Sequence, residues 1–189
     1  MNKSYIEWGT VLAGTVVALA ISTVLIQFGA AVGLTQVTNE LSADQNITPG
    51  GVLGVGIWVL WVQLLSSLAG GYLAGRMRLP MDGDVTAHES DMRDGVHGLL
   101  VWATSTLVIV MAGSIFASIA ALADNPVEDI KQVADVQRMH EHATIIFAFF
   151  AAATSLVSGV VAWAAATQGG NHRDSRADHT RYFSFRVIR

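Results

Sequence analysis

Four long apolar stretches without a charged side chain dominate the chain. They run over about Gly9–Leu34, Gly51–Gly75, His97–Ala123 and Ala143–Thr167. Each is long enough to cross the hydrocarbon core of a bilayer, which takes roughly 20 helical residues. Lipid offers the backbone no hydrogen bonds, so each stretch must be helical. The pattern predicts an all-α integral membrane protein, with four transmembrane helices packed as a bundle over residues 1–167 and an arginine-rich tail over 168–189.

The basic residues lie mostly on one side of these spans. Nine of the eleven Lys and Arg residues fall near the termini or between the second and third spans, whereas Lys131 and Arg138 fall on the opposite side. Basic residues concentrate in cytoplasmic loops, so we expect both termini in the cytoplasm. The opposite side adds seven acidic residues to its two cations and therefore carries a net charge of −5.

Two of the connecting segments carry signals for the start of a helix. Asn125-Pro126 fits an N-cap followed by proline at the first helical position, and apolar residues recur at helical spacing over 127–139. We expect a short extracytoplasmic helix there, lying on the membrane or running straight into the fourth span. Thr86–Glu89 fits a capping box, which predicts a short helix over about 87–94. Gly169-Gly170 is expected to release the tail.

Composition and charge narrow the possible functions. Only 14% of the residues are charged, against roughly 25% in an average soluble domain. The net charge of −4 excludes a nucleic-acid binder with a basic surface. The absence of cysteine excludes a disulfide scaffold and thiolate metal sites.

The histidines do not suggest a metal or haem site. His97 begins the third span on the cytoplasmic side, whereas His140 and His142 precede the fourth span on the other side, about 30 Å away. A bis-histidine haem needs both ligands at one depth. The chain also has no nucleophile-elbow, Walker or dinucleotide-binding pattern. We expect no enzyme activity, no metal and no cofactor.

The middle of the spans holds hydroxyl and amide groups but no ionisable side chain. Because proton relays use ionisable residues there, this pattern argues against a proton-driven transporter. Such groups either join helices, at about 0.6 kcal/mol per hydrogen bond, or line a narrow pore. The residues concerned are Ser22, Gln63, Ser66 and Ser155. Small residues recur at intervals of four, as in Gly29–Gly33 and Gly71–Gly75, and predict close helix packing within the chain or between subunits.

One set of residues should meet at the cytoplasmic face, where three span ends and one span start come together. These residues are Glu7, Trp8, Arg76, Asp94, His97, Trp102 and Trp163. An ion pair between Arg76 and either Glu7 or Asp94 would clasp the helix ends. Alternatively, Arg76 and His97 would bind an anionic headgroup. On the second span, Trp58 and Trp61 share a helical face and are candidates for a subunit or lipid contact.

Four segments also carry a resemblance to a known group. Glu7–Gly14, Ile57–Trp61, Ala69–Arg76 and His97–Leu107 resemble small bacterial membrane proteins labelled "PhnA-like", and the layout is similar to that of the YrzE-type family. The likeness covers roughly the first three spans. It implies a multi-pass protein of the bacterial inner membrane, and it supplies no activity, substrate or catalytic residue.

We therefore expect a non-catalytic membrane protein whose partners are lipids and other membrane subunits. It would work as a homo-oligomer or as an accessory subunit of a larger assembly. A first alternative is a small channel or facilitator for a neutral solute, lined by the hydroxyl and amide residues of the spans. A second is an anionic-lipid binder based on Arg76, His97 and the tail.

Overall fold

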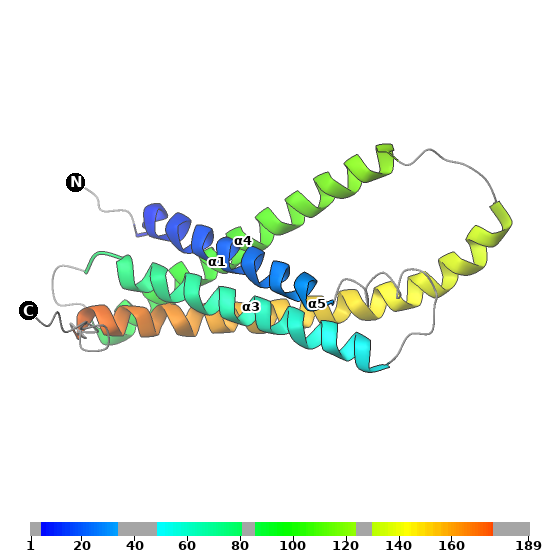
Figure 1. Cartoon of the computed structure of the whole chain (residues 1–189). Coiled ribbons are helices and arrows are strands. Elements are labelled where there is room, and N and C mark those ends of the chain that lie inside the picture. The colour runs from blue at the N-terminus through cyan, green and yellow to red at the C-terminus, as the bar shows by residue number, and fades with distance from the viewer. Residues whose placement is uncertain (1–4, 34–48, 81–85, 124–129, 176–189) are drawn as a thin grey trace, which may run out of the picture.

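The computed structural model describes residues 5–33, 49–80, 86–123 and 130–175, and these form four long helices (Figure 1). The helices are α1 (Trp8–Ala31), α3 (Pro49–Met77), α4 (Ala87–Ala123) and α5 (Ile130–Asp174). Each contains a segment long and apolar enough to cross a membrane. The described residues are all helical apart from short connecting segments, as predicted, and each of the four predicted spans lies in a helix that could cross a membrane by length and composition.

Both ends of the described chain lie at the same end of the bundle. There α1 begins, α3 ends, α4 begins and α5 ends (Figure 1). We call this the termini end, and the opposite one the far end. The helices α3 and α4 form the middle of the molecule: α1 and α5 each pack against both of them, but not against each other within the described residues.

Glycines allow unusually close helix contacts in the half of the bundle near the termini end. A Cβ atom placed on Gly14 of α1 would lie 2.5 Å from the carbonyl oxygen of Gly70 on α3. One placed on Gly71 would lie 2.5 Å from the carbonyl oxygen of Ala162 on α5. Both distances are shorter than a side-chain carbon tolerates. Only glycine permits these backbone approaches, and such approaches hold membrane helices together.

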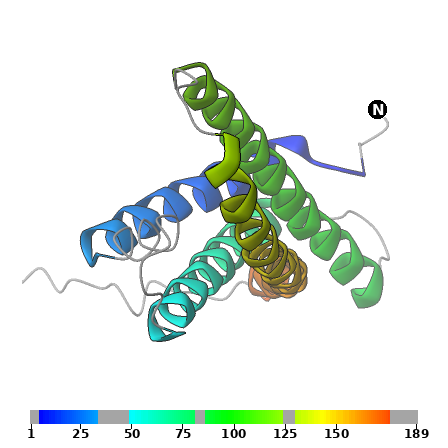
Figure 2. The ribbon, with the colours of Figure 1, turned by 90° about the vertical axis from the view of Figure 1, so that its right-hand side faces the viewer.

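The helix α4 leaves the other helices as it runs toward the far end (Figures 1 and 2). All five residues of Leu107–Met111 are exposed. Five consecutive residues exceed one helical turn, so this part of α4 has no described neighbour on any side. Further along the same helix, a Cβ atom on Gly113 would meet open space.

The start of α4 differs from the prediction. The expected cap is present, because the backbone N–H of Glu89 donates to Thr86 Oγ1 at 3.3 Å. The helix does not end near residue 94, however, but continues without interruption into the third span. Gly95 lies within it and packs against the ring of Trp163 on α5. That contact allows the charged segment 87–96 to continue as part of one long helix.

The helix α5 runs from Ile130 to Asp174. The residues after 129 are therefore continuous with the fourth span, which is one of the two predicted arrangements; 124–129 lie outside the described residues. At its other end α5 passes through Gly169-Gly170 rather than releasing the tail. These glycines stay helical because Gly169 packs against the carbonyl oxygen of Tyr72 and Gly170 packs against the carboxylate of Asp94.

Candidate functional site

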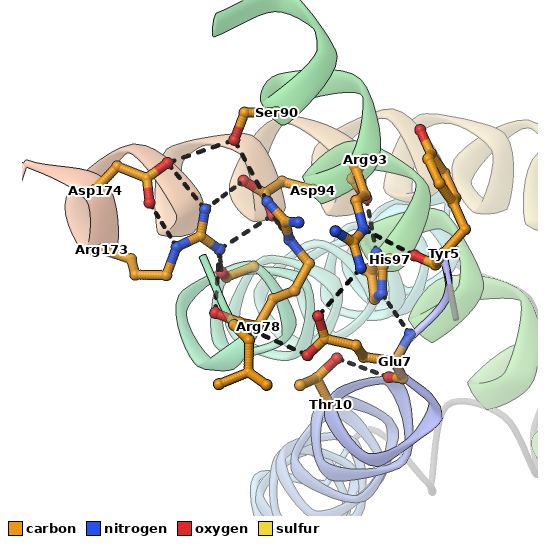
Figure 3. Close-up of polar contacts among 12 residues, drawn as sticks. Tyr5, Glu7, Thr10, Arg78, Ser90, Arg93, Asp94, His97, Arg173 and Asp174 are labelled. Atoms are coloured by element: carbon orange, nitrogen blue, oxygen red, sulfur yellow. Dashed lines mark hydrogen bonds and ion pairs between the residues drawn. The ribbon is translucent and has the colours of Figure 1, made fainter. Parts of the chain in front are cut away.

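Charged side chains and one histidine meet at the termini end (Figure 3). They come from α4, from α5 and from the segments that precede α1 and follow α3. We call this group the clasp, and its members are Glu7, Arg78, Arg93, Asp94, His97, Arg173 and Asp174. Arg78 and Asp94 are each 1% exposed and His97 is fully buried. Buried charges are strongly destabilising unless they are paired and hydrogen-bonded. The bonds within the clasp therefore decide whether this end of the molecule holds together.

The carboxylate of Asp94 joins three helices. It accepts a hydrogen bond from Nε of Arg78, the first residue after α3. It also accepts Nη1 and Nη2 of Arg173 on α5, at 3.2 and 3.1 Å. Arg173 Nη1 donates in addition to the carbonyl oxygen of Gly75 at 2.8 Å. Asp94 on α4 is thus the common acceptor for two arginines from neighbouring helices.

The carboxylate of Glu7 makes a second connection, at the start of α1. Its Oε1 atom accepts from Nη2 of Arg93 at 3.3 Å, and its Oε2 atom accepts the backbone N–H of Leu79 at 3.0 Å. Arg93 Nε also donates to the carbonyl oxygen of Tyr5 at 2.8 Å, and the guanidinium lies over the ring of that tyrosine. The residues before α1 are therefore fastened to α4 and to the segment that follows α3.

His97 lies beneath these ion pairs as a neutral imidazole. Its Nε2 atom accepts the backbone N–H of Glu7 at 2.9 Å, so this nitrogen carries no proton. Its Nδ1 atom lies 2.7 Å from the carbonyl oxygen of Arg93, to which it donates. The first N–H groups of a helix have no partner within it, and His97 supplies one at the start of α1. With both ring nitrogens occupied, the imidazole has no free group to offer a headgroup.

Tyr5 lies at an exposed edge of the clasp. Its hydroxyl donates to Oε1 of Glu89 at 3.0 Å. Partial desolvation, which is the larger cause, and this hydrogen bond raise the pKa of Tyr5 above its ordinary value. The phenol therefore stays protonated at neutral pH and keeps its donor role.

The structure brings together only part of the predicted cytoplasmic-face set. Glu7, Asp94 and His97 lie in the clasp, whereas Trp8 is exposed and Arg76 is half-buried. The rings of the other two tryptophans pack over glycines between α4 and α5: Trp102 over Gly159, and Trp163 over Gly95.

The predicted pairing of Arg76 with Glu7 or Asp94 differs from the observed one. Glu7 pairs with Arg93, and Asp94 pairs with Arg78 and Arg173. The reason is helix length: α4 begins about ten residues before the predicted third span, and α5 continues past the predicted fourth span. These extensions carry Arg93 and Arg173 into the clasp, and Arg78 enters it from the segment that follows α3. Joining the predicted 87–94 helix to the third span would have found Arg93 and His97, because residues at i and i+4 share a helix face.

Two of the four predicted mid-span polar residues bond to each other. Ser22 Oγ on α1 donates to Ser66 Oγ on α3 at 2.9 Å. Gln63 has its side-chain oxygen buried without a hydrogen-bond donor. Ser155 is half-buried, and its carbonyl oxygen accepts the hydroxyl of Ser158.

The two tryptophans of the second span have different surroundings. Trp58 donates from Nε1 to the carbonyl oxygen of Leu25 at 3.2 Å, and its ring packs over Gly29. It therefore joins α3 to α1 within the chain. Trp61 is 54% exposed and is the member of the pair that can face a subunit or lipid.

Across the described ranges, no group of three or more His, Asp or Glu side chains is arranged to hold a metal ion. In comparisons with known proteins, no family model, no curated protein and no solved structure matches this chain. None of these comparisons bears on the resemblance of the first three spans to small bacterial membrane proteins.

Proposed function

We propose that this chain is a non-catalytic subunit of a membrane assembly, either a homo-oligomer or an accessory subunit that packs against other integral membrane proteins. We place both of its termini in the cytoplasm of a bacterial inner membrane. The observation that carries the proposal is the far half of α4, where Leu107–Met111 is exposed on every side of the helix. A helix held by its own bundle at one end and uncovered at the other presents a long surface for another helix.

The distribution of small residues supports this interpretation. Near the termini end, Gly14, Gly70 and Gly71 each lie against a neighbouring backbone. Toward the far end, Cβ atoms on Gly56 and Gly113 would meet open space. Membrane helices use small residues to approach one another, so the open glycines are suited to a helix from outside the chain.

The serines beside Gly113 fit the same role. Ser114 Oγ donates to the carbonyl oxygen of Met111 at 2.9 Å, and Ser118 Oγ donates to that of Ser114 at 2.8 Å. Both hydroxyls are therefore satisfied within α4 although both residues are exposed. A neighbouring helix can approach these short side chains without leaving a donor unpaired.

The clasp supports a structural role rather than a catalytic one. Its carboxylates and its imidazole face other groups of the same chain, and their hydrogen bonds join the ends of the helices. A site for chemistry needs groups that can reach a substrate. The clasp instead fixes the termini half of the bundle, which leaves the far half as the surface that a partner would cover.

Site-specific photo-crosslinking in intact membranes tests the proposal. A benzophenone amino acid replaces Ile109 on the far half of α4, and in a control variant it replaces the equally accessible Leu12 on α1. We expect a protein adduct from position 109 and lipid adducts from position 12. The mass of the adduct distinguishes a second copy of the chain from another subunit. Lipid adducts alone at position 109 would contradict the proposal.

A second candidate function, a facilitator for a neutral solute, rests on the buried and unbonded side-chain oxygen of Gln63. An acceptor inside the membrane is suited to a hydroxyl or amide of a passing solute. Flux into liposomes that carry the purified protein, lost on Gln63→Leu, would support this function. Flux equal to that of empty liposomes would remove it.

A further inference from the structure

One guanidinium of the clasp has an incompletely bonded edge. Arg78 uses Nε to bond Asp94, but its Nη1 atom is buried with no hydrogen-bond acceptor. Its Nη2 atom has a single partner, Ser90 Oγ, at 3.4 Å. On this edge of the guanidinium, Nη1 therefore has no acceptor, and the acceptor of Nη2 lies near the limit of hydrogen-bonding distance. A buried donor without a partner in a native structure indicates a missing water, ion or ligand.

The chemistry of this edge favours a phosphate oxygen pair. A guanidinium edge presents two parallel N–H groups, and phosphate accepts both of them at once. Within the described residues, the three arginines of the clasp pair with the carboxylates of Glu7, Asp94 and Asp174. The side chains of Glu7 and Asp174 are 22% and 44% exposed, whereas that of Asp94 is 1% exposed. Arg78 shares this deeply buried carboxylate with Arg173.

Ser90 makes two long contacts beside this edge. Its Oγ atom lies 3.4 Å from Arg78 Nη2 and also 3.4 Å from Asp174 Oδ2 (Figure 3). Ser90 itself is only half-buried. Rotation of this one side chain would break both hydrogen bonds and free Nη2 for another acceptor.

The neighbours of Arg78 in the sequence are exposed apolar side chains. Met77 is 53% exposed and Leu79 is 68% exposed. These apolar side chains flank an arginine that turns inward at the end of a transmembrane helix. A lipid acyl chain would lie against the two exposed side chains while the phosphate of the same molecule lies at the depth of the guanidinium.

We propose that Arg78 binds the phosphate group of a membrane phospholipid through its Nη1 and Nη2 atoms, with Ser90 turning aside. The bound phosphate supplies the acceptor that Nη1 lacks and adds a negative charge beside an arginine that shares its buried carboxylate with Arg173. The lipid then acts as an additional member of the clasp and stabilises the termini end. Inorganic phosphate offers the same oxygens without the acyl chains, so it serves as the probe that separates the two sources.

The test compares the melting temperature of the full-length protein in detergent with three additions. These are phosphatidylglycerol, a galactosyl diacylglycerol with the same acyl chains, and inorganic phosphate. At about a hundredfold excess over its Kd, the phospholipid should raise the melting temperature by about 5–10 °C. The galactolipid, which lacks phosphate, should not. A rise with inorganic phosphate equal to that with phospholipid would overturn the lipid as the source. Equal effects of the two lipids would overturn the site.

Two variants identify the residue. Arg78→Lys keeps the charge but removes the paired N–H edge, and it should abolish the difference between the two lipids. Arg93→Lys changes another clasp arginine and should preserve that difference. If Arg78→Lys does not fold, Ser90→Ala provides the test, because removal of the covering hydroxyl should leave the response to phospholipid equal or stronger. A difference between the two lipids that persists in Arg78→Lys, or one that is lost in Ser90→Ala, would overturn the proposal.

Discussion

At the scale of single residues, the stability of the termini end depends on a few carboxylates that accept hydrogen bonds from several arginines. The almost fully buried carboxylate of Asp94 receives hydrogen bonds from Arg78, which follows α3, and from Arg173 of α5. Removing its charge leaves Arg78 buried without a carboxylate partner among the described residues and leaves Arg173 with Asp174 alone. The carboxylate of Asp174 shares one of these arginines but faces water. The two aspartates therefore form a natural pair of test positions.

We expect Asp94→Asn to lower the free energy of unfolding by about 3–5 kcal/mol, because breaking a buried ion pair leaves an unpaired charge in the interior. The matched change Asp174→Asn should lower it by about 0–1 kcal/mol, since exposed pairs contribute little. Unfolding in mixed micelles with increasing SDS measures both. Equal losses in the two variants would show that the clasp does not hold the helices together.

His97 offers a second comparison at this scale. In His97→Gln the side-chain oxygen can take the place of Nε2 and accept the backbone N–H of Glu7, whereas His97→Leu has no acceptor. We expect the leucine variant to lose about 1–3 kcal/mol, the effect of an unsatisfied buried donor, and the glutamine variant to lose less. The same unfolding titration separates them. A leucine variant as stable as the glutamine variant would contradict the role assigned to the imidazole.

At the scale of helices, glycines of the bundle have two kinds of surroundings. Gly75 on α3 lies directly against the carbonyl oxygen of Ala166 on α5, whereas Gly113 on α4 has open space beside it. The close packing of α3 against α5 requires glycine at position 75. At position 113, a side chain would contact none of the described residues.

We therefore expect opposite results from the same substitution at these two positions. Gly75→Ala should destabilise the protein by about 1–3 kcal/mol, because the added methyl group forces α3 and α5 apart. Gly113→Ala should leave stability unchanged or raise it by up to about 1 kcal/mol, since alanine favours the helix. Melting temperatures in one detergent give the comparison. A destabilising Gly113→Ala in the isolated chain would mean that α4 has a neighbour in its own bundle.

The lengths of the spans could be predicted from the sequence, but their extensions could not. Apolar length is a local property, so each span is visible in the run of uncharged residues. The capping box of the charged segment 87–96 predicts a short separate helix, whereas the observed helix continues past Gly95, which packs against Trp163. The extension of α5 through Gly169-Gly170 likewise depends on the neighbouring helices, which the local sequence does not describe.

At the scale of the whole molecule, the members of the clasp were partly predictable and their partners were not. The sequence places Glu7, Asp94 and His97 at one membrane face because span ends determine depth. The arginines at positions 76, 78, 93 and 173 are all candidate partners of the carboxylates of Glu7 and Asp94. The rotation of each helix about its axis decides between them, and rotation is set by the glycine contacts of the whole bundle.

The shape of the molecule reflects the difference between its termini half and its far half. Glycine contacts and the clasp hold the termini half together, and α4 separates from the bundle beyond them (Figures 1 and 2). An isolated chain would present the far half of α4 to lipid alone. A subunit of an assembly would present it to another helix. The central claim is that the far half of α4 contacts a helix from outside the chain.

The mass of the native particle tests that claim most directly. Membranes are extracted into copolymer nanodiscs without detergent, and the particle is measured by native mass spectrometry after the lipids are removed in the gas phase. The account predicts a mass that is a multiple of 20.1 kDa, or 20.1 kDa plus that of another membrane subunit. A particle of 20.1 kDa with no protein attached would contradict it.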